Sequence, residues 1–325
     1  MYRRRGKNPH HFETRTVYYP PACVAASCLR YRFRRQAPRQ IRGTMQKIFP
    51  AFFIQLIVIA AAFSSTLETV DIPSPCMGKS FKASVITPDA YRKSANRFSV
   101  IYFLHGYSGD YSTWPRVAPL AGYADTYALI FVCPDGAYNS WYIDSPIRPG
   151  SRFETYIVEE VVPFIDAHYR TWNKTSGRAI SGSSMGGHGA MTILAKHPEM
   201  FCGASSLSGI MDLTQFPREW DLATVLGPYE NNRELWKKNS FVGLLEKLQG
   251  EKKAIILDCG TSDFALQGNQ EAHEMLKALN IDHQYFTRPG THSPRYCGQN
   301  VESHIRYFKN ILDPPGAIKD TTKKD

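Results

Sequence analysis

The stretch Ile180-Ser181-Gly182-Ser183-Ser184-Met185-Gly186-Gly187 decides the fold of this chain. It contains the pattern G-x-S-x-G, with Ser184 at the centre and a glycine two positions away on either side. A strand that turns sharply into a helix strains its central residue, and the flanking glycines let neighbouring backbones pass without a Cβ clash. The pattern therefore predicts an exposed serine hydroxyl above a strand end, with the N–H of Met185 directed into the same space.

The residues on both sides of this stretch favour a strand before it and a helix after it. Ser176 to Ile180 is a turn followed by a short, partly apolar strand, and Gly189 to Lys196 favours a helix that stops before Pro198. The same pattern also occurs by chance in glycine- and serine-rich turns without any chemistry. In this context it predicts a nucleophile elbow, the tight turn that presents a reactive serine.

Strands and helices alternate over most of the remaining chain. Strands are predicted at 79–87, an alternating segment expected at the sheet edge, at the buried runs 98–104 and 127–133, at the small-residue segment 203–207, and at 253–259 and 282–288. Helical patterns lie at 153–169, where Pro163 predicts a kink or two shorter pieces, and at 269–279 and 300–312, with a mostly helical insertion at 211–250. The alternation predicts one three-layer α/β domain over 66–312, with a mainly parallel sheet and helices on both faces. We interpret 66–78 as a connector and 313–325 as a flexible tail.

A reactive serine needs a base that accepts its proton and a third group that orients this base. In a parallel sheet these partners belong on loops at the C-terminal ends of later strands, with the acid before the histidine. Asp263 follows the strand that ends at Cys259, and His292 follows the strand that ends near Arg288. This order predicts Ser184 as nucleophile, Asp263 as acid and His292 as base.

Other acids and histidines remain alternatives at this point. Asp263 could instead cap the segment that follows it, and Asp212 is a second acid on the loop after the preceding strand. The remaining histidines of the domain fall beside the elbow or in predicted strands and helices, where structural roles are common: His105, His168, His188, His197, His273, His283 and His304. We expect His188 to support the elbow and His105 to hold its own loop by local hydrogen bonds.

The tetrahedral intermediate of acyl transfer needs two preorganised hydrogen-bond donors for its oxyanion. Met185 supplies one N–H by the construction of the elbow. The loop His105-Gly106-Tyr107 follows a predicted buried strand and could supply the second through the N–H of Tyr107, although an ordinary turn would have the same sequence.

An aromatic loop follows the predicted strand at 127–133 and is expected to form one wall of the site. Trp141 and Tyr142 offer flat apolar surfaces for a sugar or an aromatic acyl group, and Asp144 offers a hydrogen-bond acceptor. Packing of both aromatic rings beneath the loop is the alternative. The insertion at 211–250 would then cover the opposite wall, with three candidate pocket residues: Phe216, Trp220 and Trp236.

The net charge of +10 comes entirely from the N-terminal segment. Residues 1–44 contain 11 of the 39 lysines and arginines and one acid, Glu13, whereas the remaining residues contain 28 basic and 28 acidic side chains. The predicted domain therefore offers no electrostatic basis for binding nucleic acid. Five cysteines lie in it without the spacing of a zinc site, and one disulfide is possible in an exported protein.

The sequence changes character at Met45. A short positive segment, the uncharged and mostly apolar run 48–63, and the small residues 64–66 are typical of a secretory signal peptide. We therefore predict a signal peptide at 45–65, an exported protein without a membrane span after processing, and a segment 1–44 that is not part of the mature chain. A signal-anchor helix or an organelle transit segment are the alternatives.

Four motifs together resemble the esterase D-type family of α/β-hydrolases, which includes S-formylglutathione hydrolases, tributyrin-type esterases, feruloyl and acetyl-xylan esterases, and mycolyltransferases. They are the segments 104–109 (LHGYSG), 139–142 (NSWY), 181–189 (SGSSMGGHG) and 290–293 (GTHS). The resemblance covers about 75–312 and implies the α/β-hydrolase fold, the triad Ser184, Asp263 and His292, and oxyanion donors at Tyr107 and Met185. Pro294-Arg295-Tyr296 stands where such families often have an aromatic residue directly after the His-Ser pair, which leaves the pocket shape open.

The expected function is therefore that of an exported serine carboxylesterase that acts on short-chain acyl or carbohydrate-linked esters through an acyl-enzyme. Neither a metal nor an organic cofactor is implied, and the expected partner is a small-molecule or glycan ester. Acyl transfer to a sugar or another alcohol is one alternative. A non-catalytic binding protein on the same fold is another, because a fold alone does not determine a function.

Overall fold

The computed structural model describes residues 65–312. The basic segment 1–44, nearly all of the predicted signal peptide 45–65 and the tail 313–325 lie outside the described residues. Within 65–312, no helix combines the length and the apolar character that a membrane crossing requires.

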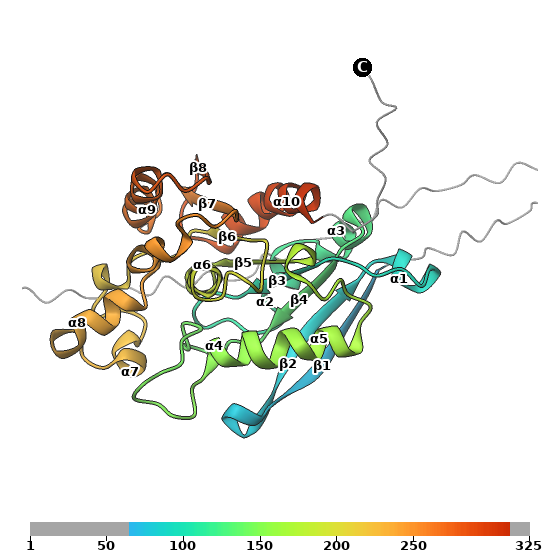
Figure 1. Cartoon of the computed structure of the whole chain (residues 1–325), viewed down its shortest axis with the longest axis horizontal. Helices are drawn as coiled ribbons and strands as arrows, with labels where there is room; N and C mark the ends of the chain where they lie inside the picture. Colours follow the sequence, from blue (N-terminus) through green and yellow to red (C-terminus); the bar gives the residue numbers. More distant parts are fainter. Residues whose placement is uncertain (1–64, 313–325) are drawn as a thin grey trace, which may run out of the picture. The chain divides into compact units, whose positions relative to one another are not determined.

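An eight-stranded sheet forms the centre of the described chain, in the order β1-β2-β4-β3-β5-β6-β7-β8 (Figure 1). Its strands are β1 (Thr66–Ser74), β2 (Lys79–Thr87), β3 (Val100–Leu104), β4 (Ile130–Pro134), β5 (Arg178–Ser183), β6 (Gly203–Leu207), β7 (Ala254–Gly260) and β8 (Gln284–Arg288). The six neighbouring strands β4-β3-β5-β6-β7-β8 pair in parallel. Strand β1 pairs with β2, and β2 with β4, in the antiparallel sense. The predicted mainly parallel sheet is confirmed.

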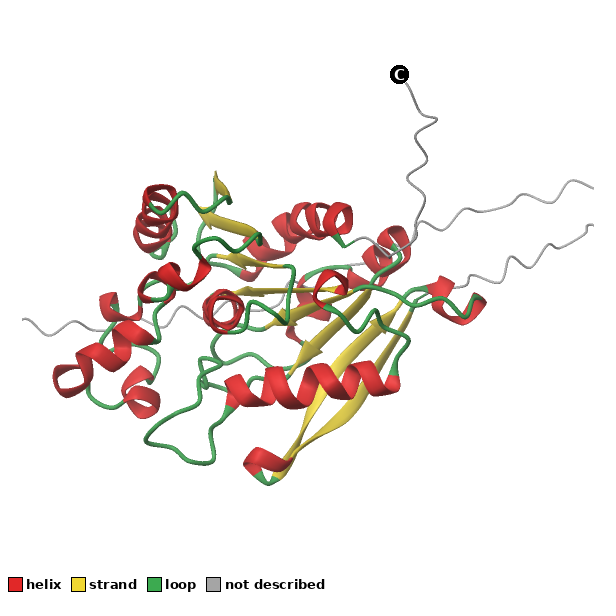
Figure 2. Cartoon of the chain, viewed as in Figure 1, coloured by secondary structure: helices red, strands yellow, loops and turns green. Residues whose placement is uncertain are grey.

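Helices cover both faces of this sheet, as Figure 2 shows. They are α1 (Asp89–Lys93), α2 (Thr113–Val117), α3 (Leu120–Tyr127), α4 (Phe153–Thr155), α5 (Val162–His168), α6 (Met185–Lys196), α7 (Leu222–Leu226), α8 (Tyr229–Lys238), α9 (Leu266–Ala278) and α10 (Pro294–Ile311). One buried apolar cluster packs α4 to α9 against the sheet, and a second packs α2, α3 and α10 against it. Every residue of β3 and β4 is buried, as expected for strands covered on both faces.

The interpretation of 66–78 as a connector is wrong. Residues Thr66–Ser74 form β1, the edge strand of the sheet, and β2 lies inside it with partners on both sides. Pro73 and Pro75 suggested a connector, but proline is tolerated at a sheet edge because no ladder hydrogen bond is lost on the solvent side. The hairpin turns through Pro75–Met77 and Gly78, whose φ of 67° suits glycine.

Two helices differ from their predicted form. The segment predicted as one helix with a kink or two shorter pieces at Pro163 consists of α4, the π-helical turn Tyr156–Val161 and α5, with Pro163 in the first turn of α5, where its missing N–H is tolerated. Helix α10 begins at Pro294, six residues before the predicted start at 300. The oxygen of Ser293 accepts from the N–H of Tyr296 at 3.3 Å, so a serine cap and a proline at the first helical position start this helix.

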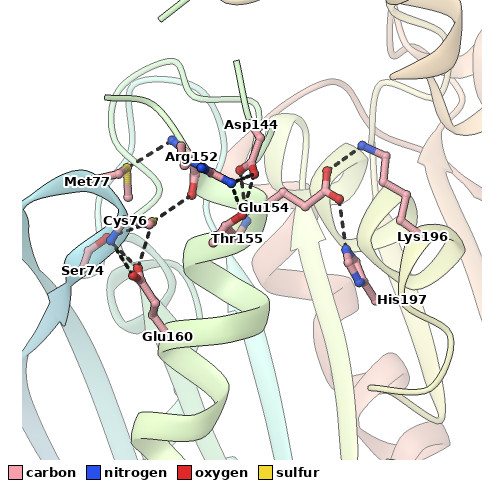
Figure 3. Close-up of polar contacts among 10 residues, drawn as sticks. All are labelled: Ser74, Cys76, Met77, Asp144, Arg152, Glu154, Thr155, Glu160, Lys196 and His197. Atoms are coloured by element: carbon pink, nitrogen blue, oxygen red, sulfur yellow. Dashed lines mark hydrogen bonds and ion pairs between the residues drawn. The ribbon is translucent and has the colours of Figure 1, made fainter. Parts of the chain in front are cut away.

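Polar side chains attach the helical segment 153–168 to its neighbours (Figure 3). The carboxylate of Glu154 accepts from Lys196 Nζ at 2.6 Å and from the Nε2–H of His197 at 3.0 Å. Burial alone would raise the pKa of Glu154, but these hydrogen bonds and charges outweigh burial and hold it below its usual value. Glu160 accepts from the hydroxyl of Ser74 at 2.6 Å and so attaches the β1–β2 hairpin to the same helical segment.

We predict that the network around Glu154 makes stability depend on pH. A carboxyl group whose pKa is lower in the folded state stabilises the fold above its unfolded pKa, near 4.5, and loses this contribution as pH falls through the folded value. At pH 6, Glu154→Gln should lower the free energy of unfolding by about 1–3 kcal/mol, because Lys196 and His197 lose a charged acceptor. In urea unfolding experiments this difference from wild type should shrink toward pH 3.

The exposed Glu234 provides the matched control. Glu234→Gln should leave the free energy of unfolding within about 0.5 kcal/mol of wild type at both pH values. An equal effect of Glu154→Gln at pH 6 and pH 3 would contradict the assignment.

Candidate active site

Ser184 lies at a strained turn between β5 and α6. Its backbone has φ 55° and ψ −118°, outside the regions that most residues adopt, and its N–H donates to the carbonyl of Leu207 at 3.0 Å. A Cβ atom on Gly182 would lie 2.2 Å from the carbonyl oxygen of Gly186. A Cβ on Gly186 would lie 2.1 Å from the carbonyl oxygen of Leu104. The two glycines thus permit the close backbone packing that a nucleophile elbow requires.

The structure brings Ser184, His292 and Asp263 into one hydrogen-bonded chain. His292 Nε2 lies 2.8 Å from Ser184 Oγ, and His292 Nδ1 lies 2.9 Å and 3.1 Å from the two carboxylate oxygens of Asp263. Ser184 follows β5, Asp263 follows β7 and His292 follows β8, so all three lie on loops at the C-terminal ends of parallel strands. This is the arrangement in which a histidine can accept the proton of a serine.

Asp263 is held as a charged acceptor although it is largely buried. Burial raises the pKa of this carboxyl group, but the hydrogen bond from His292 and the backbone N–H of Ala265, at 2.8 Å, outweigh burial and lower it. A carboxylate at this place fixes the Nδ1–H tautomer of His292, which leaves Nε2 as an acceptor toward Ser184.

The alternative acid and the other histidines have structural partners. Asp212 accepts from the N–H of Thr214 at 2.9 Å and caps the short helical turn Leu213–Gln215. His105 Nε2 accepts from the N–H of Gly136 at 2.7 Å, and its Nδ1 lies 2.8 Å from the carbonyl of Gly106, so this ring holds its own loop as expected. The ring of His188 is buried behind the elbow, where burial lowers its pKa to about 3 and keeps it neutral.

The two expected oxyanion donors belong to the segments next to Ser184, the start of α6 and the loop after β3. Met185 is the first residue of α6, where a helical N–H has no acceptor inside the helix. The loop that carries Tyr107 passes directly over the elbow, since a Cβ atom on Gly106 would lie 3.4 Å from Ser184 Cβ. The hydroxyl of Tyr107 donates to Asp221 at 2.8 Å and anchors this loop to the insertion 211–250.

Trp141 and Tyr142 are buried core residues, so the expectation that they form the pocket wall is wrong. Trp141 is 1% exposed, and its Nε1–H donates to the carbonyl of Trp220 at 3.3 Å. Tyr142 is fully buried, its hydroxyl donates to the carbonyl of His105 at 3.2 Å, and its ring fills the space beside Gly189. Both residues have positive φ, which turns their side chains beneath the loop.

Asp144 caps a helix and is not among the residues that line the cavity at Ser184, so the structure gives no support to its expected role in holding a substrate. Its carboxylate accepts from the N–H of Thr155 at 3.0 Å and from the hydroxyl of Thr155 at 2.5 Å (Figure 3). A negative charge in the first turn of a helix satisfies free N–H groups and interacts favourably with the helix dipole.

A cavity of about 420 Å³ opens at Ser184 and His292. Its walls include Trp220, as expected, and also Trp114 and Phe264. Phe264 directly follows Asp263, is 50% exposed and stacks on the ring of His292 with centroids 4.2 Å apart. Sequence reasoning missed Phe264, although an aromatic residue next to the candidate acid could have suggested it. Trp236, another expected pocket residue, is fully buried and does not line this cavity.

A second group that sequence reasoning missed surrounds Asp258 in β7. This side chain is fully buried, and it contacts the hydroxyl of Tyr296, the guanidinium of Arg288 and, at 3.1 Å, Nε2 of His304. Arg288 ends β8 just before the His292 loop, and Tyr296 lies in the first turn of α10 just after it. Asp258 therefore fastens both ends of the loop that carries His292.

Within 65–312, no group of three or more His, Cys, Asp or Glu side chains has the arrangement of a metal site. The five cysteines of this region are free.

The fold and this site geometry define an α/β-hydrolase with a Ser–His–Asp arrangement. The chain belongs to the esterase family described as "Putative esterase", whose pattern matches residues 74–302. This confirms the resemblance noted in the sequence.

Named relatives agree with this assignment. An esterase of Mycobacterium tuberculosis is 31% identical over 238 residues, which cover 64% of this chain and 52% of that protein, so the chain spans about half its length. A diacylglycerol acyltransferase/mycolyltransferase of the same species is 28% identical over 286 residues, covering 75% of this chain and 82% of that one. A solved ferulic acid esterase shares the fold with a TM-score of 0.69 at 24% identity, covering 77% of this chain and 100% of its own.

We predict that Asp258→Asn lowers stability strongly. The substitution leaves Arg288 without its buried countercharge, which should lower the free energy of unfolding by about 3 kcal/mol. Asp212→Asn is the matched control, because the asparagine oxygen can still cap the short helical turn, so the free energy of unfolding should stay within about 0.5 kcal/mol of wild type. Equal midpoints of urea unfolding for the two variants would contradict the anchoring role of Asp258.

Proposed function

We propose that this protein is an exported serine carboxylesterase that hydrolyses short-chain acyl or carbohydrate-linked esters. The observation that carries the proposal is the hydrogen-bonded chain from Ser184 Oγ through His292 to Asp263. Ser184 and His292 line a cavity large enough for a small ester. Membership of the esterase family supports the same reaction class.

The reaction follows from the positions of these groups. Ser184 Oγ attacks the ester carbonyl carbon while His292 Nε2 accepts its proton, and the carbonyl oxygen becomes an oxyanion. The N–H groups of Met185 and Tyr107 are the proposed donors to this oxyanion. The tetrahedral intermediate collapses, the bond to the alcohol oxygen breaks, and His292 returns the proton to that oxygen.

The second half of the cycle removes the acyl group from Ser184. Water enters beside His292, which accepts one of its protons while the water oxygen attacks the acyl carbon. Collapse of this second tetrahedral intermediate breaks the bond to Ser184 Oγ, and His292 returns the proton to that oxygen. Throughout the cycle Asp263 stays ionised and stabilises the imidazolium that forms twice.

Acyl transfer to an alcohol is the second candidate, supported by the similarity to the mycolyltransferase. The chemistry up to the acyl-enzyme is the same, and only the acceptor in the second half differs. Product analysis in the presence of a sugar or another alcohol separates the two candidates: hydrolysis releases the free acid, and transfer forms a new ester.

We predict that Ser184→Ala lowers kcat on p-nitrophenyl acetate by about 10⁴-fold or more with the fold intact. Asp263→Asn should also lower kcat by about 10⁴-fold, because an amide favours the wrong tautomer of His292. Asp212→Asn, the matched acid on the neighbouring loop, should retain wild-type kcat. Steady-state kinetics measure all three variants, and a Ser184→Ala protein that keeps wild-type turnover would disprove the assignment.

Export is supported by the sequence around residues 45–65, where a positive segment precedes an uncharged apolar run. We predict that N-terminal sequencing of the natural protein finds a mature start near Ser65, and that a chain beginning there folds and keeps esterase activity. A mature start within residues 2–40 would contradict export by this signal peptide.

A further inference from the structure

A second hollow lies next to the catalytic cavity and shares one wall with it. It has a volume of about 390 Å³ and is lined by Gln215, Phe216, Phe264 and Gln267. Phe264 also lines the catalytic cavity, so its exposed ring separates the two spaces. The other lining residues come from the short helical turn Leu213–Gln215, from the residue after it, and from the first turn of α9.

The polar side chains of this hollow are held in place by a third one. Glu271, one turn further along α9, accepts from Gln215 Nε2 at 2.6 Å and from Gln267 Nε2 at 2.9 Å. A carboxamide offers two N–H donors and one carbonyl acceptor, so each bond to Glu271 uses only one of the three groups. The arrangement fixes two planar amides beside two aromatic rings.

The chemistry of the lining selects one class of occupant. None of the four lining residues carries a positive charge, and Glu271 is an acid, so an anionic group would be repelled. A hydrocarbon chain would cover the amides without satisfying them, which costs free energy. A neutral, polyhydroxylated ring suits the site, because its C–H face packs on an aromatic ring and its hydroxyls exchange hydrogen bonds with amides.

The position of Phe264 indicates which part of the ester reaches this hollow. His292 Nε2 must lie within hydrogen-bond reach of the alcohol oxygen that leaves in the first step. Phe264 stacks on the ring of His292, with centroids 4.2 Å apart, and also lines the hollow. An alcohol that accepts a proton from His292 and continues across Phe264 therefore enters the space between Gln215 and Gln267.

We propose that this hollow is a sugar-binding subsite for the alcohol part of the ester, which makes carbohydrate esters the preferred substrates. The inference rests on the proposed esterase function and adds to it the residues that select the alcohol. The acyl group then occupies the catalytic cavity on the side of Trp114 and Cys297.

The test compares three esters with one acyl group: methyl 6-O-acetyl-β-D-glucopyranoside, hexyl acetate and p-nitrophenyl acetate. Gln267→Leu removes the amide and keeps the size of the side chain. Its kcat/KM should fall by about tenfold for the sugar acetate and stay within about twofold of wild type for the other two esters. Gln215→Leu, on a different segment of the chain, should give the same pattern.

Gln270→Leu is the matched control, because Gln270 is an exposed residue of the same helix and does not line the hollow. It should leave all three esters unchanged. The proposal is overturned if Gln267→Leu and Gln215→Leu spare the sugar acetate, lower all three esters equally, or lower hexyl acetate alone. Failure of the proposed esterase function would appear differently: the wild-type protein would not hydrolyse p-nitrophenyl acetate, or Ser184→Ala would hydrolyse it equally fast.

Discussion

The close approach of two backbones at the elbow is the constraint on which the rest of the structure depends. The first turn of α6 lies against the end of β3, and a single added carbon on Gly186 would come within 2.1 Å of the carbonyl of Leu104. This contact places Ser184 directly beneath the loop that carries Tyr107. A larger residue at 186 would push α6 away from the sheet and separate the nucleophile from the proposed oxyanion donors.

The parallel sheet then brings together residues that are far apart in the sequence. Ser184 and His292 are 108 positions apart, yet β5 to β8 all end at the same edge, so their following loops meet there. Position alone does not give catalytic precision, because loops move more than strands. The buried carboxylate of Asp258 supplies that precision by holding the start and the end of the His292 loop. The hydrogen bond from the Tyr107 hydroxyl to Asp221 likewise holds the Tyr107 loop in place against the insertion 211–250.

The sequence predicted those features that depend on local pattern and strand order. The elbow, the meeting of Asp263 and His292 with Ser184, and the central buried strands follow from glycine spacing and apolar runs. Strand β1 was not predicted, because Pro73 and the following Pro75 also fit a connector, and only the pairing with β2 defines the strand. The direction of Trp141 and Tyr142 depends on positive φ angles within a loop, which a run of aromatic residues does not reveal. The hollow beside Phe264 joins segments about fifty residues apart and has no local pattern.

Covalent labelling tests the central claim most directly, which is that Ser184 is the nucleophile activated by His292. Wild-type protein treated with diisopropyl fluorophosphate should gain one diisopropylphosphoryl group and lose its activity on p-nitrophenyl acetate. Fragmentation mass spectrometry of the labelled peptide should place the group on Ser184 and not on the adjacent Ser183. A group on Ser183 or on another residue, or a His292→Ala protein labelled as fast as wild type, would contradict the account.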